Sequence, residues 1–181
     1  MSDFVKLERI LGIKIGDEAV YREALTHKSF AAEHQLGYDN QRLELLGDAV
    51  VQIILTDYLY KRYKDLQEGD LTKIRSAMVN QDALAQFARD ISLGSFLMLG
   101  RGELELHGQD RDSTISDAFE SLIGAVYLDQ SGFIIHHSLR VCCISQQTLF
   151  IQFPHFPLHP EHPPPEGQPM HFLPDFFARQ T

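Results

Sequence analysis

The sequence predicts an all-α protein, and two observations carry that prediction. The chain has 181 residues, and its first 153 contain no proline although eight prolines follow. Proline breaks helix interiors, so its absence allows an almost wholly helical body. Within that body, apolar residues recur at helical spacing, and the longest such stripe consists of Leu43, Leu46, Val50, Ile53 and Ile54. A chain of this length can bury one hydrophobic core.

The N-terminal part of the chain predicts two helices. Apolar spacing over residues 4–11 indicates a helix that Gly12 ends. Asp17 is placed to cap a second helix, which we expect to end near residues 26–29. His27 lies in that stretch, where a histidine either caps or packs the helix end or contacts a substrate.

The central helix is expected to run from a cap at Asn40 to about Tyr63. Projected at 100° per residue, the apolar stripe occupies one face and polar residues occupy the other. Glu44 and Asp48 are neighbours on the polar face, about 6 Å apart at Cβ, where like charges repel. Leu45 lies among these polar groups, which suggests that something covers this face, such as another chain.

The segment after the central helix is less regular. A turn precedes Asp70, which is placed to cap a helix that begins at Leu71. Residues 93–103 are punctuated by glycine and predict a loop with a short apolar insert. Ser113 is placed to cap the next helix.

That helix carries a second acidic pair, Asp117 and Glu120, on an otherwise apolar surface. It should therefore be largely buried. A buried carboxylate costs several kcal/mol unless it is paired or bound to a metal. If this pair faces Glu44 and Asp48, four carboxylates form an all-oxygen cage. Such a cage suits Mg²⁺ or Mn²⁺ rather than zinc.

These motifs resemble those of the ribonuclease III family. The similarity runs from about Phe4 to Asp129 and includes four motifs in the family's order. They are residues 24–29, residues 40–51, residues 68–71 with Arg75, and residues 117–120. The resemblance implies a compact helical ribonuclease III-type endonuclease domain, with hydrolysis of double-stranded RNA of the rRNA or mRNA processing type. It also implies a homodimer in which two sites each cut one strand and leave a short 3′ overhang.

We assign Glu44, Asp48, Asp117 and Glu120 as ligands of Mg²⁺ or Mn²⁺, with Asp48 and Glu120 also catalytic. Glu44 and Glu120 are expected to be the most direct ligands, and the other two act directly or through metal-bound water. A divalent ion would neutralise the phosphodiester and activate water, so no histidine base or serine nucleophile is required. Leu45 is where we expect the partner chain to pack.

Other candidates are less specific. Supporting groups are Glu68, Gln41 and Asn40, and RNA-contacting groups are Lys73, Arg75 and His27. The family position implies that Glu68 lies near the cage; alternatively it is an acid that favours the helix dipole. Gln41 stands where the family more often has Glu, and keeps the hydrogen-bonding reach without the charge. For Lys73 and Arg75, the alternative to a phosphate contact is a solvated charged face.

The amino-acid composition restricts the binding partners and the cellular compartment that we expect for the protein. A formal net charge of −9 is unexpected for a nucleic-acid binder, so any RNA affinity must come from local patches or be weak. No run of 18 apolar residues and no signal-peptide layout is present, so we expect a soluble, cytoplasmic protein that enters no membrane. The two adjacent cysteines, Cys142 and Cys143, fit neither a zinc site nor a disulfide framework, which favours a reducing compartment.

The C-terminal part differs from the rest. We divide the chain into a nuclease domain at 1–133, a divergent segment at 134–153 and a Pro/His-rich tail at 154–181, expected to be extended or disordered. The amphipathic closing helix of the family has no counterpart, and we interpret this end as a reading-frame shift or a divergent terminus. The separate RNA-binding domain usual in the family does not follow either, which should weaken substrate binding.

Two rival interpretations remain open. The first is a catalytically silent RNA-binding or regulatory module with the same fold, against which the presence of all four acids argues. The second is an unrelated bundle that holds a redox metal pair. That class has histidine three residues after a glutamate, whereas Val51 and Ile123 follow Asp48 and Glu120 at that spacing.

Overall fold

The computed structural model describes residues 3–130, and within this range every regular element is a helix, which confirms the all-α prediction. One isolated bridge joins Thr26 and Met98. The elements are α1 (Asp3–Leu11), α2 (Glu18–Ala24), α3 (Lys28–His34), α4 (Gln41–Arg62), α5 (Glu68–Met78), α6 (Gln81–Asp90), η1 (Leu93–Phe96), α7 (Arg101–Glu105), η2 (Gly108–Asp110) and α8 (Asp112–Asp129).

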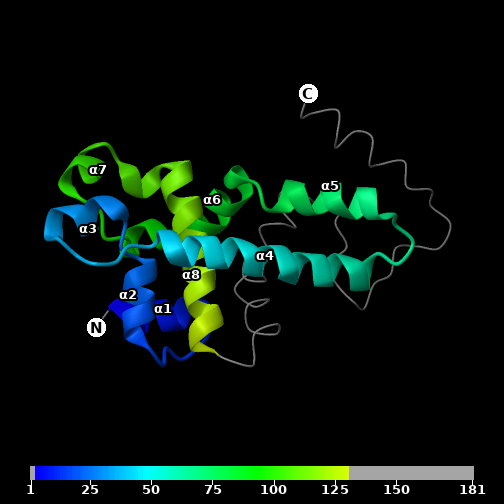
Figure 1. Ribbon diagram of the computed structural model, residues 1–181, viewed down its shortest axis with the longest axis horizontal. Coiled ribbons are helices and arrows are strands. Elements are labelled where there is room, and N and C mark those ends of the chain that lie inside the picture. Colours follow the sequence, from blue (N-terminus) through cyan, green and yellow to red (C-terminus); the bar gives the residue numbers. More distant parts are fainter. Residues whose placement is uncertain (1–2, 131–181) are drawn as a thin grey trace. The chain divides into compact units, whose positions relative to one another are not determined.

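Helix α8 forms the centre of this fold. It packs most extensively against α4, then against α6 and α2. Its apolar side chains are almost all buried, and Phe119, Leu122 and Ile123 are at most 1% exposed. Figure 1 shows α8 crossing the N-terminal half of α4, while α5 returns antiparallel beside the C-terminal half. The burial expected for the helix that carries Asp117 and Glu120 is therefore observed.

Two glycines allow α4 and α8 to approach closely where they cross. A Cβ atom placed on Gly124 of α8 would lie 2.5 Å from the carbonyl oxygen of Leu43 on α4. A Cβ atom on Gly47 would overlap the carbonyl oxygen of Glu120. Only residues without a side chain permit this backbone contact. The crossing brings together the turns of α4 and α8 that carry the acidic residues.

The C-terminal end of α8 is anchored to the α1–α2 connection by Asp129. Its carboxylate accepts hydrogen bonds from the amides of Gly16 (3.0 Å) and Asp17 (2.8 Å) and from the hydroxyl of buried Tyr21 (3.2 Å). Burial raises the pKa of Asp129, but these hydrogen bonds and one from Gln130 Nε2 (2.8 Å) outweigh it, and the pKa is lowered overall. Burial, and then the charge of Asp129, raises the pKa of Tyr21.

The N-terminal helices follow the sequence expectation in part. Gly12 ends α1 with a φ of 66°, and the side chain of Asp17 caps α2 by accepting from the amide of Ala19 at 2.9 Å. The expected helix end near residues 26–29 is wrong, because α2 ends at Ala24 and the separate helix α3 follows. A helix of seven residues contains too little apolar repeat to be recognised from spacing alone.

The central helix ends at Arg62, one residue before the expected end, but two details were wrong. Asn40 makes no side-chain cap; instead Asp39 Oδ1 accepts from the Gln41 amide at 3.0 Å. Ile53, assigned to the core stripe, is 67% exposed. The part of α4 beyond the crossing with α8 has fewer neighbours, so an apolar residue there can face outward.

Two further caps were placed too late in the sequence. Helix α5 begins at Glu68, so Asp70 lies inside its first turn. Helix α8 begins at Asp112, so Ser113 is already helical. The expected loop at residues 93–103 contains η1 and the start of α7. Acidic and hydroxyl residues are favourable both at caps and in first turns, which makes a shift of this size common.

Among residues 3–130, no helix has the length and apolar character that crossing a bilayer requires. The predictions for 134–153 and 154–181, including the origin of that end and the cysteine pair, fall on residues outside the described range. The last three residues of the expected nuclease domain also fall outside it.

Candidate metal centre

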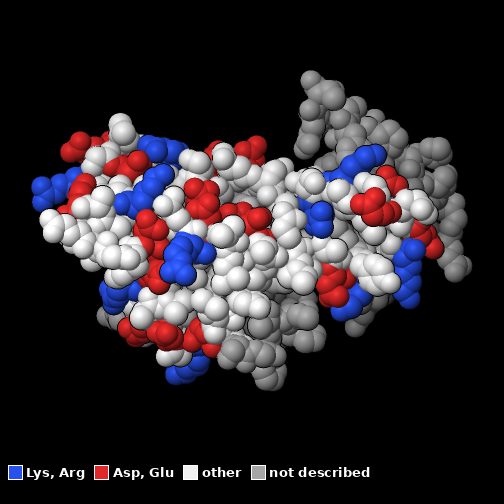
Figure 2. All heavy atoms as spheres, in the orientation of Figure 1, with Lys and Arg blue, Asp and Glu red and all other residues white. Residues whose placement is uncertain are grey.

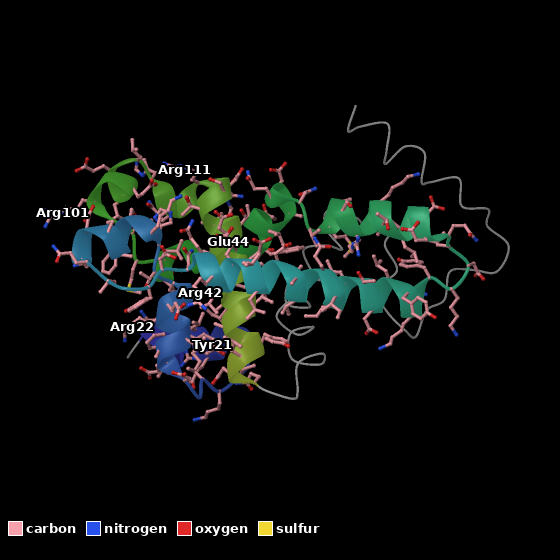
Figure 3. The ribbon with its side chains drawn as sticks, in the orientation of Figure 1. Tyr21, Arg22, Arg42, Glu44, Arg101 and Arg111 are labelled. Carbon is pink, nitrogen blue, oxygen red and sulfur yellow. The ribbon has the colours of Figure 1, made fainter. Side chains whose placement is uncertain are left out.

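The crossing of α4 and α8 brings three carboxylates together. Glu44, Asp117 and Glu120 each offer one oxygen, and these oxygens lie within 4.8 Å of one another. Glu44 comes from the first turn of α4, and Figure 3 shows it at the start of that helix. The other two acids come from α8. We call these three residues with Asp48 the acidic cluster.

Asp48 lies at the edge of the acidic cluster. It is exposed, and Gln52 donates a long hydrogen bond of 3.4 Å to its Oδ1. Its oxygens are outside the 4.8 Å group, yet its charge acts on Glu120 more strongly than that of Asp117 or Glu44. All four acids predicted to share a site are thus close to one another, with Asp48 the most open to solvent.

Burial, and after it repulsion between like charges, disfavours ionisation within the cluster. Burial, followed by the charges of Asp48, Asp117 and Glu44, raises the pKa of Glu120 to about 7. Burial and then the charge of Asp117 raise the pKa of Glu44, and burial raises the pKa of Asp117. Like charges in a partly buried site cannot all ionise at low cost. The four acids therefore need a positive partner near neutral pH.

The donor chemistry fits a hard divalent cation. The three converging groups and Asp48 are all carboxylates, which Mg²⁺ and Mn²⁺ prefer, and no histidine or cysteine joins the group within residues 3–130. Figure 2 shows acidic side chains gathered over the start of α4, on the face of the molecule that the view presents. Residues of this kind, in this arrangement, can hold a divalent ion at the protein surface.

The two supporting groups beside the cluster have structural contacts. Asn40 is buried. Its backbone amide donates to the backbone carbonyl of Thr26 at 2.8 Å, and its backbone carbonyl accepts from Ser121 Oγ at 2.9 Å. These bonds connect the α2–α3 turn, the start of α4 and the middle of α8. Gln41 is exposed at the first position of α4.

His27 has the geometry of a capping residue. Its Nδ1 accepts from the Ser29 amide at 3.3 Å and lies 2.8 Å from Ser29 Oγ. Burial lowers the pKa of His27, and the charge of Lys28 adds to this effect, although Glu103 opposes it. Its charge in turn lowers the pKa of Asp117, so His27 also lies near the acidic cluster.

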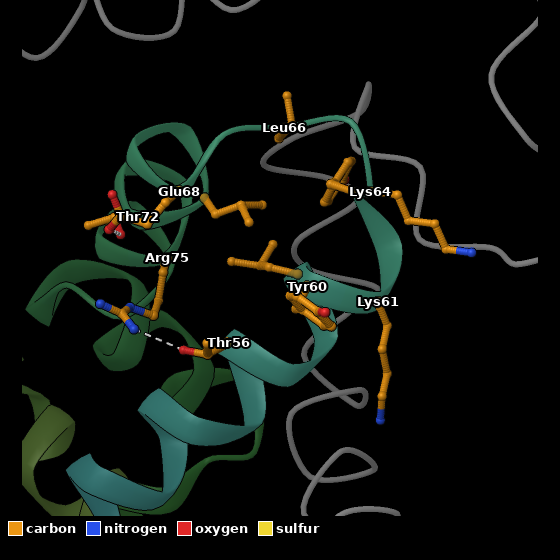
Figure 4. A pocket seen from close by; sticks show the side chains of 11 residues that line it. Thr56, Tyr60, Lys61, Lys64, Leu66, Glu68, Thr72 and Arg75 are labelled. Carbon is orange, nitrogen blue, oxygen red and sulfur yellow. Dashed lines mark hydrogen bonds between the residues drawn. The ribbon is translucent and has the colours of Figure 1, made fainter.

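Glu68 and Arg75 do not lie at the cluster within one chain. They line a surface pocket of about 910 Å³ between the end of α4 and the start of α5 (Figure 4). Glu68 Oε1 accepts from Thr72 at 3.0 Å, and Arg75 donates to Thr56 at 2.9 Å. At 1.5 Å per residue, Thr56 lies about 18 Å along α4 from Glu44. Within one chain the structure does not bring Glu68 to the acidic cluster, and its assignment as a supporting group stays a prediction.

Lys73 and Leu45 are both exposed. The Lys73 ammonium lies 3.7 Å from Asp70 Oδ1, in a surface contact that contributes little. Leu45 is 76% exposed, and Ile53 (67%) and Tyr60 (73%) follow it along α4. Their spacing places the three on one side of the helix, as an exposed apolar row. Of this row, only Leu45 is predicted from the sequence to lie outside the core.

Lys28 is the site residue that sequence reasoning missed. Although burial raises the pKa of Glu44 and of Asp117, the positive charge of Lys28 lowers both. It is the first residue of α3 and is exposed. It belongs to the 24–29 motif, but the motif alone does not indicate which of its side chains faces the acids.

Comparison with known proteins gives a consistent result. The family described as ribonuclease-III-like matches residues 17–139. The chain is 45% identical to ribonuclease 3 of Oceanobacillus iheyensis over 130 residues, which are 71% of this chain and 57% of that protein. It is 50% identical to ribonuclease 3 of Symbiobacterium thermophilum over 119 residues, 66% of this chain and 50% of that protein. The chain spans about half the length of the curated relatives it matches.

Solved structures resemble the fold. The nuclease domain of ribonuclease III from Campylobacter jejuni, described as flexible in a region involved in dimer formation, superposes with a TM-score of 0.71 at 35% identity. The match covers 84% of this chain and 99% of that domain. Dicer from Pichia stipitis matches with a TM-score of 0.57 at 22% identity, covering 79% of this chain and 60% of that one, which shows likeness of fold alone.

Proposed function

Because the chain belongs to the ribonuclease III family, we propose that it is a divalent-metal-dependent endoribonuclease that hydrolyses phosphodiester bonds of double-stranded RNA. The substrates that the resemblance implies are precursors of ribosomal or messenger RNA. The observation that supports the proposal most strongly is the convergence of Glu44, Asp117 and Glu120, with oxygens within 4.8 Å. Carboxylates whose pKa is raised by burial and by like charges are typical of functional sites.

Each acid has a proposed role that follows from its position. Glu44 of α4 and Glu120 of α8 would hold Mg²⁺ or Mn²⁺, and Asp117 of α8 would complete the ligand set. When bound, the ion neutralises the phosphodiester and activates the attacking water. Asp48 is open to solvent at the edge of the cluster, where a carboxylate can orient that water or accept its proton.

We also propose that the enzyme acts as a homodimer. The exposed row of Leu45, Ile53 and Tyr60 gives α4 an apolar side that water does not favour. A second copy of α4 that packs on this row would bury it by an interface of two-fold symmetry. The resemblance to a nuclease domain with a region involved in dimer formation supports this arrangement. Two acidic clusters in one dimer would allow both strands of a duplex to be cut.

The test is a cleavage assay on long duplex RNA with the full-length chain. We expect cutting with Mg²⁺ and none with EDTA. Glu120→Gln removes a charged ligand but keeps the shape of the side chain, so it should reduce cutting at least about 100-fold while duplex binding is retained. Glu105→Gln, an exposed change on α7, serves as the matched control and should cut normally.

Two outcomes would contradict the proposal. Cutting that continues in EDTA would exclude a divalent-ion mechanism. Binding of duplex RNA without any cutting by the unaltered chain would instead favour the catalytically silent module.

A further inference from the structure

The negative charge of the acidic cluster should repel the RNA backbone, even when a divalent ion is bound. Four carboxylates and one divalent ion leave a formal charge of about −2, while the substrate is an anionic phosphodiester. The whole chain carries a net charge of −9, so the protein provides no general attraction for RNA. A phosphate that approaches the cluster therefore needs a cation from the protein beside the metal.

The backbone before Lys28 is firmly attached to the elements that carry the acidic cluster. The carbonyl of Thr26 accepts from the amide of Asn40 at 2.8 Å. The carbonyl of Asn40 accepts both from the amide of Glu44 at 2.9 Å and from Ser121 Oγ at 2.9 Å. These bonds join the turn that leads into Lys28, the first turn of α4 and the middle of α8. The chain therefore reaches Lys28 from a backbone that is fixed two residues earlier against α4 and α8.

The charge of Lys28 is available to a ligand. Its side chain is exposed, and it forms no ion pair with any carboxylate of residues 3–130. Arg111, another cation in this part of the structure, is already engaged at 3.0 Å by Glu103. Within the described range, Lys28 is the only lysine or arginine whose charge acts on both Glu44 and Asp117.

We propose that Lys28 binds a phosphate of the RNA backbone next to the acidic cluster and so positions the strand that is to be cut. The ammonium group donates to a non-bridging phosphate oxygen, while the acids hold the divalent ion. This inference rests on the proposed ribonuclease function and adds a substrate-positioning residue outside the four acids. A lysine in this role contributes affinity and register, and it carries no base specificity.

The first measurement is the affinity of the full chain for a fluorescein-labelled duplex RNA. The background is Glu120→Gln, so that the RNA stays intact. Adding Lys28→Gln should raise the Kd about three- to tenfold and reduce the slope of log Kd against log salt by about 1. Lys28→Arg should restore both values. Lys14→Gln makes the same change of charge on the exposed α1–α2 connection and should alter neither.

The second measurement is Mn²⁺ binding by the RNA-free chain with Glu120 intact. Removing the positive charge of Lys28 relieves its repulsion of the ion, so Lys28→Gln should bind Mn²⁺ a few-fold more tightly. Weaker RNA binding combined with stronger metal binding cannot result from partial unfolding, which would weaken both.

Several results would overturn the proposal. Equal duplex affinity and salt slope in Lys28→Gln and Lys14→Gln, together with RNA cutting by the unaltered chain, would exclude the role of Lys28 and leave the proposed function intact. Loss of both metal and RNA affinity would show that Lys28 has only a structural role. Failure of the unaltered chain to bind duplex RNA at all would remove the proposed function and this inference together.

Discussion

Gly124→Ala tests whether the close crossing of α4 and α8 holds the acidic cluster together. The new Cβ atom would lie 2.5 Å from the carbonyl oxygen of Leu43 and 3.3 Å from the amide nitrogen of Gly47. Close carbon–oxygen contacts in proteins are normally about 3.3–3.6 Å, so α4 and α8 must separate by about 1 Å. Both neighbouring atoms belong to a helix backbone, so neither can move aside as a side chain would.

The expected cost follows from two opposing effects. Overpacking a closely packed contact costs about 1–3 kcal/mol, while alanine is favoured over glycine in a helix by about 1 kcal/mol. The net loss of unfolding free energy should be about 0–2 kcal/mol, which lowers the Tm by up to about 8 °C for a domain of this size. The effect on RNA cutting by the acidic cluster should be larger than the effect on stability. Displacing Glu120 by about 1 Å from Glu44 should reduce RNA cutting about 100-fold.

The assay compares thermal unfolding, followed by far-ultraviolet circular dichroism, with the rate of duplex cleavage. Gly102→Ala is the matched control, because its Cβ would meet no atom within 4 Å. It should leave activity unchanged and leave the Tm unchanged or raise it slightly. An unchanged Tm and an unchanged cutting rate in Gly124→Ala would refute the idea that the helix crossing sets the geometry of the site.

Three further predictions concern charge and assembly. In EDTA, Glu120→Gln should stabilise the protein by about 1 kcal/mol above pH 7, after allowance for solvent screening. Burial and then neighbouring acids raise the pKa of Glu120 from 4.5 to about 7, so the unaltered chain loses the stabilising protonated form as pH rises through 7. The stability that Glu120→Gln gains over the unaltered chain should therefore vanish near pH 4.5 in thermal melts. Asp129→Asn should cost about 1–2 kcal/mol by weakening the hydrogen bonds that anchor α8, including that from Tyr21. Because the folded pKa of Asp129 is lowered, urea denaturation should show this cost at neutral pH and a smaller one below about pH 3.8. Leu45→Glu should shift sedimentation toward the monomer, whereas Leu106→Glu, a change at a similarly exposed leucine outside α4, should not; equal sedimentation of both variants would argue against the α4 interface.

The helices and the convergence of acids could be predicted because they depend on patterns within each segment. The apolar circumference of the last helix predicts its burial, and the i, i+4 spacing of Glu44 and Asp48 predicts that they share a face. Asp117 and Glu120 require a positive partner when they are buried. A divalent ion shared with Glu44 and Asp48 would meet this requirement, so the two acidic pairs are expected to lie together. The structure places these residues as this reasoning expects, while their roles in binding and catalysis stay predictions.

Features that depend on packing between segments could not be predicted. Ile53 was assigned to the core because helical projection does not show where along α4 the packing against α8 ends. The position of Glu68 at the far end of α4 depends on the hairpin with α5. The close approach at Gly124 depends on a crossing point between helices that are far apart in sequence. Lys28 was missed for the same reason, since its neighbours come from α4 and α8.

The central claim is that the acidic cluster exists to hold a divalent ion, and Mn²⁺ binding to the metal-free full-length chain tests it most directly. Titration calorimetry should show saturable binding to the unaltered chain and to Glu105→Gln, and should show that binding lost or greatly weakened in Glu120→Gln. Identical isotherms for all three proteins, or no binding to any of them, would contradict the claim.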